Sequence, residues 1–132
     1  MRIVLDTNIY ISAAIIGRVC EEILKICRFG GLDVFISKDI IIEIETKLKD
    51  KFFWNEQQIR IFIENILEFC HMVEVSEKIL YLKDDHDDDK ILGCAIASKC
   101  AYIVSGDEHL TRLKYFQNIK ILNPADFLIL IK

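Results

Sequence analysis

Aspartates at three places in this chain of 132 residues could take part in chemistry. Asp6 directly follows the apolar run RIVL, and Asp107 follows the apolar run AYIVS at 101–105 after one glycine. Five aspartates, a histidine and a lysine fill residues 84–90, DDHDDDK. Carboxylates are the ligands that hard divalent cations prefer, so these acids predict a metal site wherever the fold brings them together.

The apolar pattern predicts strands that alternate with helices. We expect strands at 2–5, 33–36, 72–75, 101–105 and 119–122, and helices at 9–16, 19–29, 38–48, 56–70, 88–99 and 124–131. Ser37 is the expected N-cap of the third helix, and Pro124 opens the last one. This alternation predicts an α/β fold with a central, mostly parallel sheet and helices on both faces, built as a single domain over residues 1–132.

The expected fold places several acids at one edge of the sheet. Parallel strands end at the same edge, so Asp6 and Asp107 belong there. The helix that contains Asp88 and Asp89 precedes the strand at 101–105 and runs antiparallel to it, so its N-terminus returns to that edge.

A carboxylate cluster of this kind is unfavourable by itself. Two unit charges about 4 Å apart repel by roughly 4 kcal/mol at an effective dielectric near 20. A helix N-terminus offsets only about 0.3 to 1 kcal/mol. A bound Mg²⁺ or Mn²⁺, or a raised pKa, has to compensate, and a divalent ion with open coordination positions is suited to phosphodiester hydrolysis. The net charge of −4 argues against a broad electrostatic grip on nucleic acid, so the metal would supply the missing positive charge.

Cysteine usage and the N-terminus indicate a cytoplasmic location. The five cysteines are odd in number, form no C-x-x-C pair and lie in apolar runs, which predicts buried, reduced thiols. The N-terminal apolar run is too short for a signal peptide, and no run approaches a membrane-spanning length. We therefore expect no membrane partner.

Five segments, in order along nearly the whole chain, resemble the PIN-domain family, specifically the VapC-like toxins of prokaryotic toxin–antitoxin systems. They are IVLDTNIYISA (3–13), SKDIIIE (37–43), DDHDDDKILGCA (84–95), AYIVSGDEHL (101–110) and ILNPADFL (121–128). The resemblance implies a three-layer α/β/α sandwich and an endoribonuclease that uses one or two Mg²⁺ or Mn²⁺ ions. It further implies an RNA substrate, a cognate antitoxin and a homodimer.

The resemblance also assigns roles to residues. The catalytic, metal-binding acids implied by it are Asp6, Glu43, Asp89 and Asp107, and the small polar residues that support them are Thr7, Asn8 and Ser105. Gly93 and His86 depart from the family pattern, which puts in doubt the polar surroundings of the site and the tightness of the turn before Asp89. Lys90 and Arg112, with Lys99 and Lys114, flank the same two elements and are candidates for phosphate contact.

Simpler interpretations compete with several of these assignments. Asp6 suits a helix N-cap and Asp107 a turn, while periodicity alone does not choose between Glu43 and Glu45. Solvated turn positions account for Asp84, Asp85 and Asp87, and Asp88 suits a helix cap or an indirect role at the metal. The three histidines share no ligand spacing, although His109 lies close to Asp107 in sequence. The patch KFFWN (51–55) fits either the core or a dimer or antitoxin surface.

Other functions fit less well. A calcium loop that starts at Asp84 places Asp89 where glycine is needed and Ala95 where a bidentate glutamate is needed. An aspartyl phosphotransferase wants a second aspartate two residues after Asp6, where Asn8 stands. The main alternative is a degenerate PIN domain that binds RNA or protein without cleaving, which four intact acids disfavour.

Overall fold

The computed structural model describes residues 1–75 and 86–132, and the side chains of residues 1–75 and 89–132. Asp84 and Asp85, expected in a solvated turn, lie outside the described residues, as do the side chains of Asp87 and Asp88.

Strands and helices alternate through most of the chain. The elements are β1 (Arg2–Leu5), α1 (Thr7–Ile15), α2 (Arg18–Phe29), β2 (Asp33–Ser37), α3 (Lys38–Phe52), α4 (Glu56–Leu67), β3 (Cys70–Val73), α5 (His86–Ser98), β4 (Tyr102–Val104), α6 (Glu108–Thr111), β5 (Tyr115–Phe116), β6 (Ile119–Leu122) and α7 (Pro124–Ile131). All the expected strands and helices are present within a few residues of their predicted bounds.

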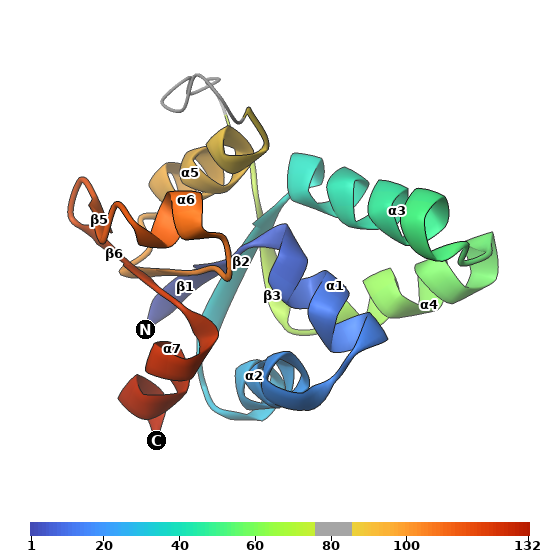
Figure 1. Ribbon diagram of the computed structural model, residues 1–132, viewed down its shortest axis with the longest axis horizontal. Coiled ribbons are helices and arrows are strands. Elements are labelled where there is room, and N and C mark those ends of the chain that lie inside the picture. The colour runs from blue at the N-terminus through green and yellow to red at the C-terminus, as the bar shows by residue number, and fades with distance from the viewer. Residues whose placement is uncertain (76–85) are drawn as a thin grey trace.

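The strands form one sheet in the order β3-β2-β1-β4-β6-β5 (Figure 1). β1 lies at its centre, where Ile3 pairs in parallel with Val34 of β2 and with Tyr102 of β4. Only β5, at one edge, is antiparallel among the described strands. The mostly parallel α/β sheet is confirmed, and the carboxyl ends of β1, β2 and β4 share one edge.

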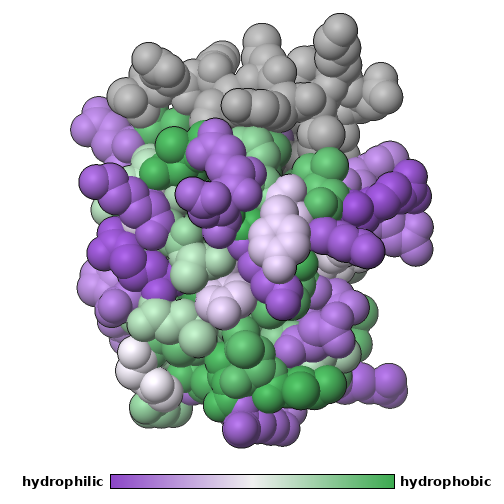
Figure 2. Space-filling view, turned by 90° about the vertical axis from the view of Figure 1, so that its left-hand side faces the viewer, coloured by the Kyte–Doolittle hydropathy of each residue, from purple (hydrophilic) through white to green (hydrophobic). Residues whose placement is uncertain are grey.

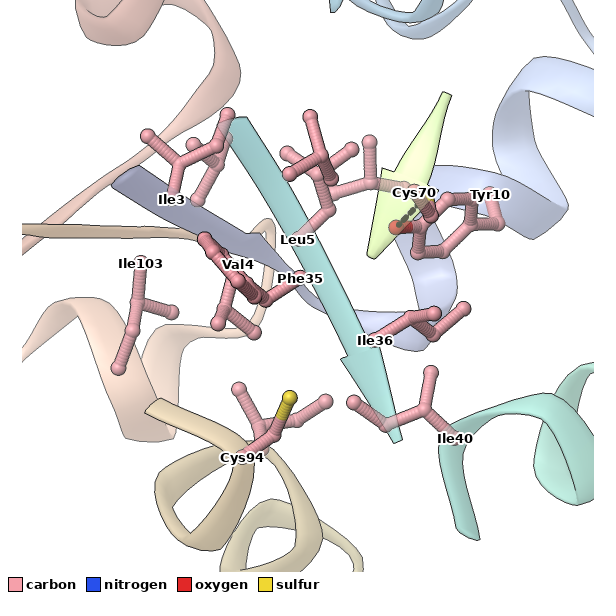
Figure 3. Packing of buried hydrophobic residues seen from close by; sticks show 14 of the residues in the cluster. Ile3, Val4, Leu5, Tyr10, Phe35, Ile36, Ile40, Cys70, Cys94 and Ile103 are labelled. Carbon is pink, nitrogen blue, oxygen red and sulfur yellow. Dashed lines mark hydrogen bonds between the residues drawn. The ribbon is translucent and has the colours of Figure 1, made fainter. Parts of the chain in front are cut away.

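Helices cover both faces of this sheet and give it three layers. In Figure 3, Tyr10 of α1 and Cys94 of α5 approach β2 from opposite sides, and both residues are fully buried. The Tyr10 hydroxyl lies 3.5 Å from Cys70 Sγ of β3, so this buried polar group has a partner. Because β1 and β2 are buried on both faces, their sequences are nearly continuous apolar runs rather than alternating ones.

Two elements were not expected from the sequence, and one strand begins earlier than predicted. The helix α6 and the strand β5 are too short to show a period. β3 begins at Cys70, which pairs with Val34, because α4 ends at Leu67 and leaves the chain free to enter the sheet. The KFFWN patch divides: Phe53 is 86% exposed, whereas the Trp54 ring packs edge-on against Phe62 at 5.9 Å.

All five cysteines are free thiols. Cys27, Cys70, Cys94 and Cys100 are buried, as expected, but Cys20 is only partly buried. Burial raises the pKa of the Cys27 and Cys94 thiols to about 12, so these groups are protonated at neutral pH. Within the described part of the chain, none of the helices combines the length and apolar character needed to cross a membrane.

Apolar side chains also reach the surface near the C-terminus. Figure 2 shows polar side chains over much of one face and apolar surface in its lower part. On α7, Ile129 is 76% exposed, and with Leu130 and Tyr115 it lines an open cavity of about 580 Å³. None of the four candidate acids lines this cavity, so it is separate from the chemistry considered below.

Candidate active site

Asp6 is the centre of the candidate site. It follows β1, and its backbone N–H donates to Val104 O of the neighbouring strand at 2.9 Å. It occupies the N-cap position of α1, yet its side chain makes no capping hydrogen bond. The carboxylate is buried and accepts a hydrogen bond of 2.6 Å from Ser105 Oγ. Capping therefore does not explain this aspartate.

The pKa of Asp6 is raised above its ordinary value. Burial is the largest cause, and the carboxylates of Glu43 and Asp107 add to it. The hydrogen bond from Ser105 and the charge of Lys47 oppose the rise. Because the charges of Glu43 and Asp107 affect the pKa of Asp6, the fold places these three carboxyl groups near one another.

Ser105 joins two of these acids. Its hydroxyl donates to Asp6 Oδ2 and accepts from the backbone N–H of Asp107 at 3.0 Å. The residue directly follows β4 and is fully buried. Leu5 pairs with Val104, so the strand register places the residues after both strands side by side. Ser105 therefore bridges Asp6 and Asp107, and its role in supporting a metal site stays a prediction.

Glu43 enters the site from α3, the helix that Ser37 caps by accepting from the Ile40 N–H at 3.3 Å. Its side chain is only 9% exposed, whereas Glu45 lies on the exposed side of the same helix. Lys90 Nζ lies 3.3 Å from Glu43 Oε2, and Lys47 Nζ lies 3.8 Å from Oε1. Burial separates the two glutamates where periodicity did not.

Asp89 lies in the first turn of α5 and is buried, at 7% exposure. This helix begins at His86, two residues earlier than predicted. It packs against β1, β2 and α3. The neighbouring Lys90 links the helix directly to Glu43.

Asp107 serves as the N-cap of α6, because its Oδ1 accepts from the His109 N–H at 2.8 Å. A turn role therefore accounts for one oxygen of the Asp107 carboxylate. The charge of the same carboxylate also raises the pKa of Asp6. His109 is exposed, and Arg112 is 74% exposed and forms only a long contact of 4.0 Å with Glu108. Among the described contacts, Arg112 has none with the candidate acids.

Thr7 and Asn8, the first residues of α1, behave differently. Thr7 is buried, and its hydroxyl has no hydrogen-bond partner among the described residues. Asn8 is exposed, and its Oδ1 accepts from Lys47 Nζ at 3.2 Å. Lys47 was not singled out from the sequence, although its spacing of four residues from Glu43 on one helix is a usable signal.

The donor set fits a hard divalent cation in its chemistry. The candidate acids offer oxygen atoms without cysteine or histidine. Burial, with the carboxylates of Glu43 and Asp107, raises the pKa of Asp6, and the buried Thr7 hydroxyl has no hydrogen-bond partner among the described residues. In the part of the chain that the structure describes, however, no three acidic, histidine or cysteine side chains are already gathered closely enough to hold an ion. Lysines rather than a ligand shell flank Glu43.

Comparison with known proteins places this arrangement in a family. The PIN domain family matches residues 2–109, so the chain belongs to the PIN-domain family. A chain from the crystal structure of VapBC2 from Rickettsia felis, bound to a DNA fragment from the promoter, has a TM-score of 0.68 and 16% sequence identity. The match covers 93% of this chain and 98% of that one, and it supports the three-layer α/β/α fold. No curated protein matches the sequence.

Proposed function

We propose that this chain is a divalent-metal-dependent endoribonuclease, acts as one domain over residues 1–132, and is the toxin of a toxin–antitoxin pair. The observation that carries the proposal is Asp6, a carboxylate that does not cap its helix and whose pKa is raised by burial first and by the neighbouring acids second. An acid in this environment is unfavourable for stability alone, and perturbed carboxylates of this kind cluster at functional sites.

In this proposal, Asp6, Glu43, Asp89 and Asp107 hold one or two Mg²⁺ or Mn²⁺ ions. When bound, such an ion activates water and stabilises the leaving oxygen of a phosphodiester. Ser105 orients Asp6 and favours its ionised form through a short hydrogen bond, which lowers the pKa of Asp6 against the effect of burial. Lys90, which is 37% exposed and lies beside Glu43, is the best placed of the four predicted phosphate contacts. Arg112, Lys99 and Lys114 are exposed, and none of them has a described contact with the candidate acids.

The proposed partners follow from the same family. The similar chain comes from a structure of VapBC2 with promoter DNA, which supports a cognate antitoxin for this protein as well. A homodimer stays a prediction, which size-exclusion chromatography with light scattering tests directly. An RNA substrate and five thiols outside any disulfide favour the cytoplasm as its location.

A degenerate PIN domain that binds RNA or protein without cleaving is the alternative, and one observation favours it. Glu43 is engaged by two lysines, and one oxygen of Asp107 is engaged as a helix cap. Acids that are satisfied by protein groups have less need of a metal. The two functions predict opposite results for metal-dependent cleavage.

The deciding experiment incubates the purified chain with single-stranded and structured RNA and Mn²⁺, with and without EDTA. We expect cleavage that EDTA abolishes, and a loss of at least about 100-fold in Asp6→Asn and Glu43→Gln. Glu45→Gln is the matched control, because it makes the same change on the exposed side of α3. Cleavage that survives EDTA, or equal activity of the Glu43 and Glu45 variants, contradicts the proposal, and binding without cleavage supports the alternative.

A further inference from the structure

Lys47 brings a positive charge of the protein's own into the acidic site. Its Nζ donates to Asn8 Oδ1 at 3.2 Å and lies 3.8 Å from Glu43 Oε1. Its side chain is 21% exposed, so the charge is partly shielded from water. The hydrogen bond to Asn8 joins α3 to the first turn of α1, the helix that follows Asp6.

The charge of Lys47 acts on more than one acid. Besides pairing with Glu43, it lowers the pKa of Asp6 against the opposing effects of burial and the neighbouring carboxylates. Lys90 approaches the other oxygen of Glu43 at 3.3 Å, so ammonium groups lie near both oxygens of this carboxylate. A lysine ammonium is a compact charge on a flexible stem, and it can leave without unfolding the helix that carries it.

We propose that Lys47 is an internal counter-cation: it stabilises the carboxylates of Glu43 and Asp6 in the metal-free protein and competes with a divalent cation for Glu43. This inference rests on the proposed metal-dependent function. A metal ion that binds Glu43 has to displace or repel Lys47, so this lysine lowers metal affinity while it stabilises the metal-free fold. It is a positioning residue, since it acts on the ligands rather than on RNA.

Two readouts on the purified full chain test the inference without using activity. Calorimetric titration with Mn²⁺ measures metal affinity, and thermal unfolding in EDTA measures the stability of the metal-free protein. For Lys47→Met we expect Mn²⁺ to bind about two- to fivefold more tightly, and the melting temperature in EDTA to fall. Lys47→Gln serves as a second variant if Lys47→Met does not fold.

Matched variants separate a counter-cation from a simple structural contact. Lys49→Met removes the same charge from an exposed position of α3, and we expect wild-type Mn²⁺ affinity. Lys47→Arg keeps the positive charge, so we expect its Mn²⁺ affinity to stay close to that of wild type. The gain in Lys47→Met shrinks as salt increases, because screening weakens the interaction of partly exposed charges.

Unchanged or weaker Mn²⁺ binding in both Lys47→Met and Lys47→Gln overturns the inference. If wild type still binds Mn²⁺ and cleaves RNA, the proposed function stands without it. If the wild-type protein does not bind Mn²⁺, both the inference about Lys47 and the proposed metal-dependent function are wrong. The wild-type titration therefore distinguishes failure of the function from failure of the inference alone.

Discussion

Replacement of Ser105 by alanine tests the link between the two strand ends that hold Asp6 and Asp107. The Ser105 hydroxyl donates to Asp6 Oδ2 at 2.6 Å and accepts from the Asp107 N–H at 3.0 Å, and the residue is fully buried. Alanine removes a hydrogen bond to a charged group and leaves a backbone donor without its acceptor. Because a hydrogen bond to a charged group contributes roughly 1.5 to 3 kcal/mol, we expect Ser105→Ala to lower the free energy of unfolding by about that amount at pH 7.

The loss should depend on pH with a definite sign. The pKa of Asp6 is raised in the folded state, so the folded protein binds more protons between the unfolded and folded pKa values, and stability falls as pH rises through that window. The Ser105 hydrogen bond opposes the rise, so alanine raises this pKa further and deepens the cost at neutral pH. As pH falls to about 4, near the ordinary aspartate pKa, a growing fraction of Asp6 is protonated in the folded protein, because its pKa is raised. We therefore expect the loss to shrink toward roughly 0.5 to 1.5 kcal/mol, the contribution of a hydrogen bond between neutral groups.

Urea unfolding of wild type and Ser105→Ala at both pH values measures these differences. Ser98→Ala is the control, because Ser98 is equally buried but its hydroxyl donates to the neutral Ala95 carbonyl at 3.2 Å. Its loss should be about 0.5 to 1.5 kcal/mol at either pH. A loss for Ser105→Ala that is the same at both pH values, or no larger than that for Ser98→Ala, refutes the argument that the hydroxyl stabilises an ionised Asp6.

Two further predictions concern the fold that holds the site. Arg2 donates two hydrogen bonds of 2.9 and 2.6 Å to Ser98 O at the end of α5, and its guanidinium lies 4.3 Å from the Phe35 ring centroid. We expect Arg2→Met to lower the free energy of unfolding by roughly 1 to 2 kcal/mol in urea titrations, and a change below about 0.5 kcal/mol counts against this. Partial burial of Cys20 predicts that alkylation of the native protein labels this thiol first, since burial raises the pKa of Cys27 and Cys94 to about 12. Mass spectrometry identifies the labelled thiol, and equally fast labelling of Cys94 contradicts the prediction.

The sequence predicted the sheet and the position of its acids well, for a physical reason. Apolar runs bounded by capping and turn residues define parallel strands, and parallel strands end at one edge, so Asp6 and Asp107 were placed there without coordinates. The sequence did not predict the short elements α6 and β5, because four and two residues are too few to show a periodic pattern. Periodicity alone did not choose between Glu43 and Glu45, because both flank the apolar stripe of α3. The family resemblance selected Glu43, and tertiary packing buries that residue.

Charge partners were the least predictable part of the site. Lys47 acts on Glu43 from the same helix, so its spacing was visible, but its contact with Asn8 depends on how α3 packs against α1. Arg112 and Lys90 looked equivalent from sequence, since each flanks an acidic element. In the structure Lys90 contacts Glu43, whereas Arg112 is 74% exposed and contacts Glu108. Side-chain direction on a surface depends on contacts that no local pattern encodes.

The N-cap residues of this fold differ in whether their side chains form a stabilising capping hydrogen bond. Ser37, Asn55, Asp107 and Asn123 each accept a backbone hydrogen bond at the start of a helix. Asp6 occupies the same position before α1 and does not. A cap of this kind contributes about 0.5 to 2 kcal/mol, and the fold forgoes it while burying a carboxylate whose pKa is raised. Among the described N-caps, Gly17 before α2 has no side chain to offer, so Asp6 is the one whose side chain could cap its helix and does not. This departure indicates that the Asp6 carboxylate is kept for another task, because departures of this kind concentrate at functional sites.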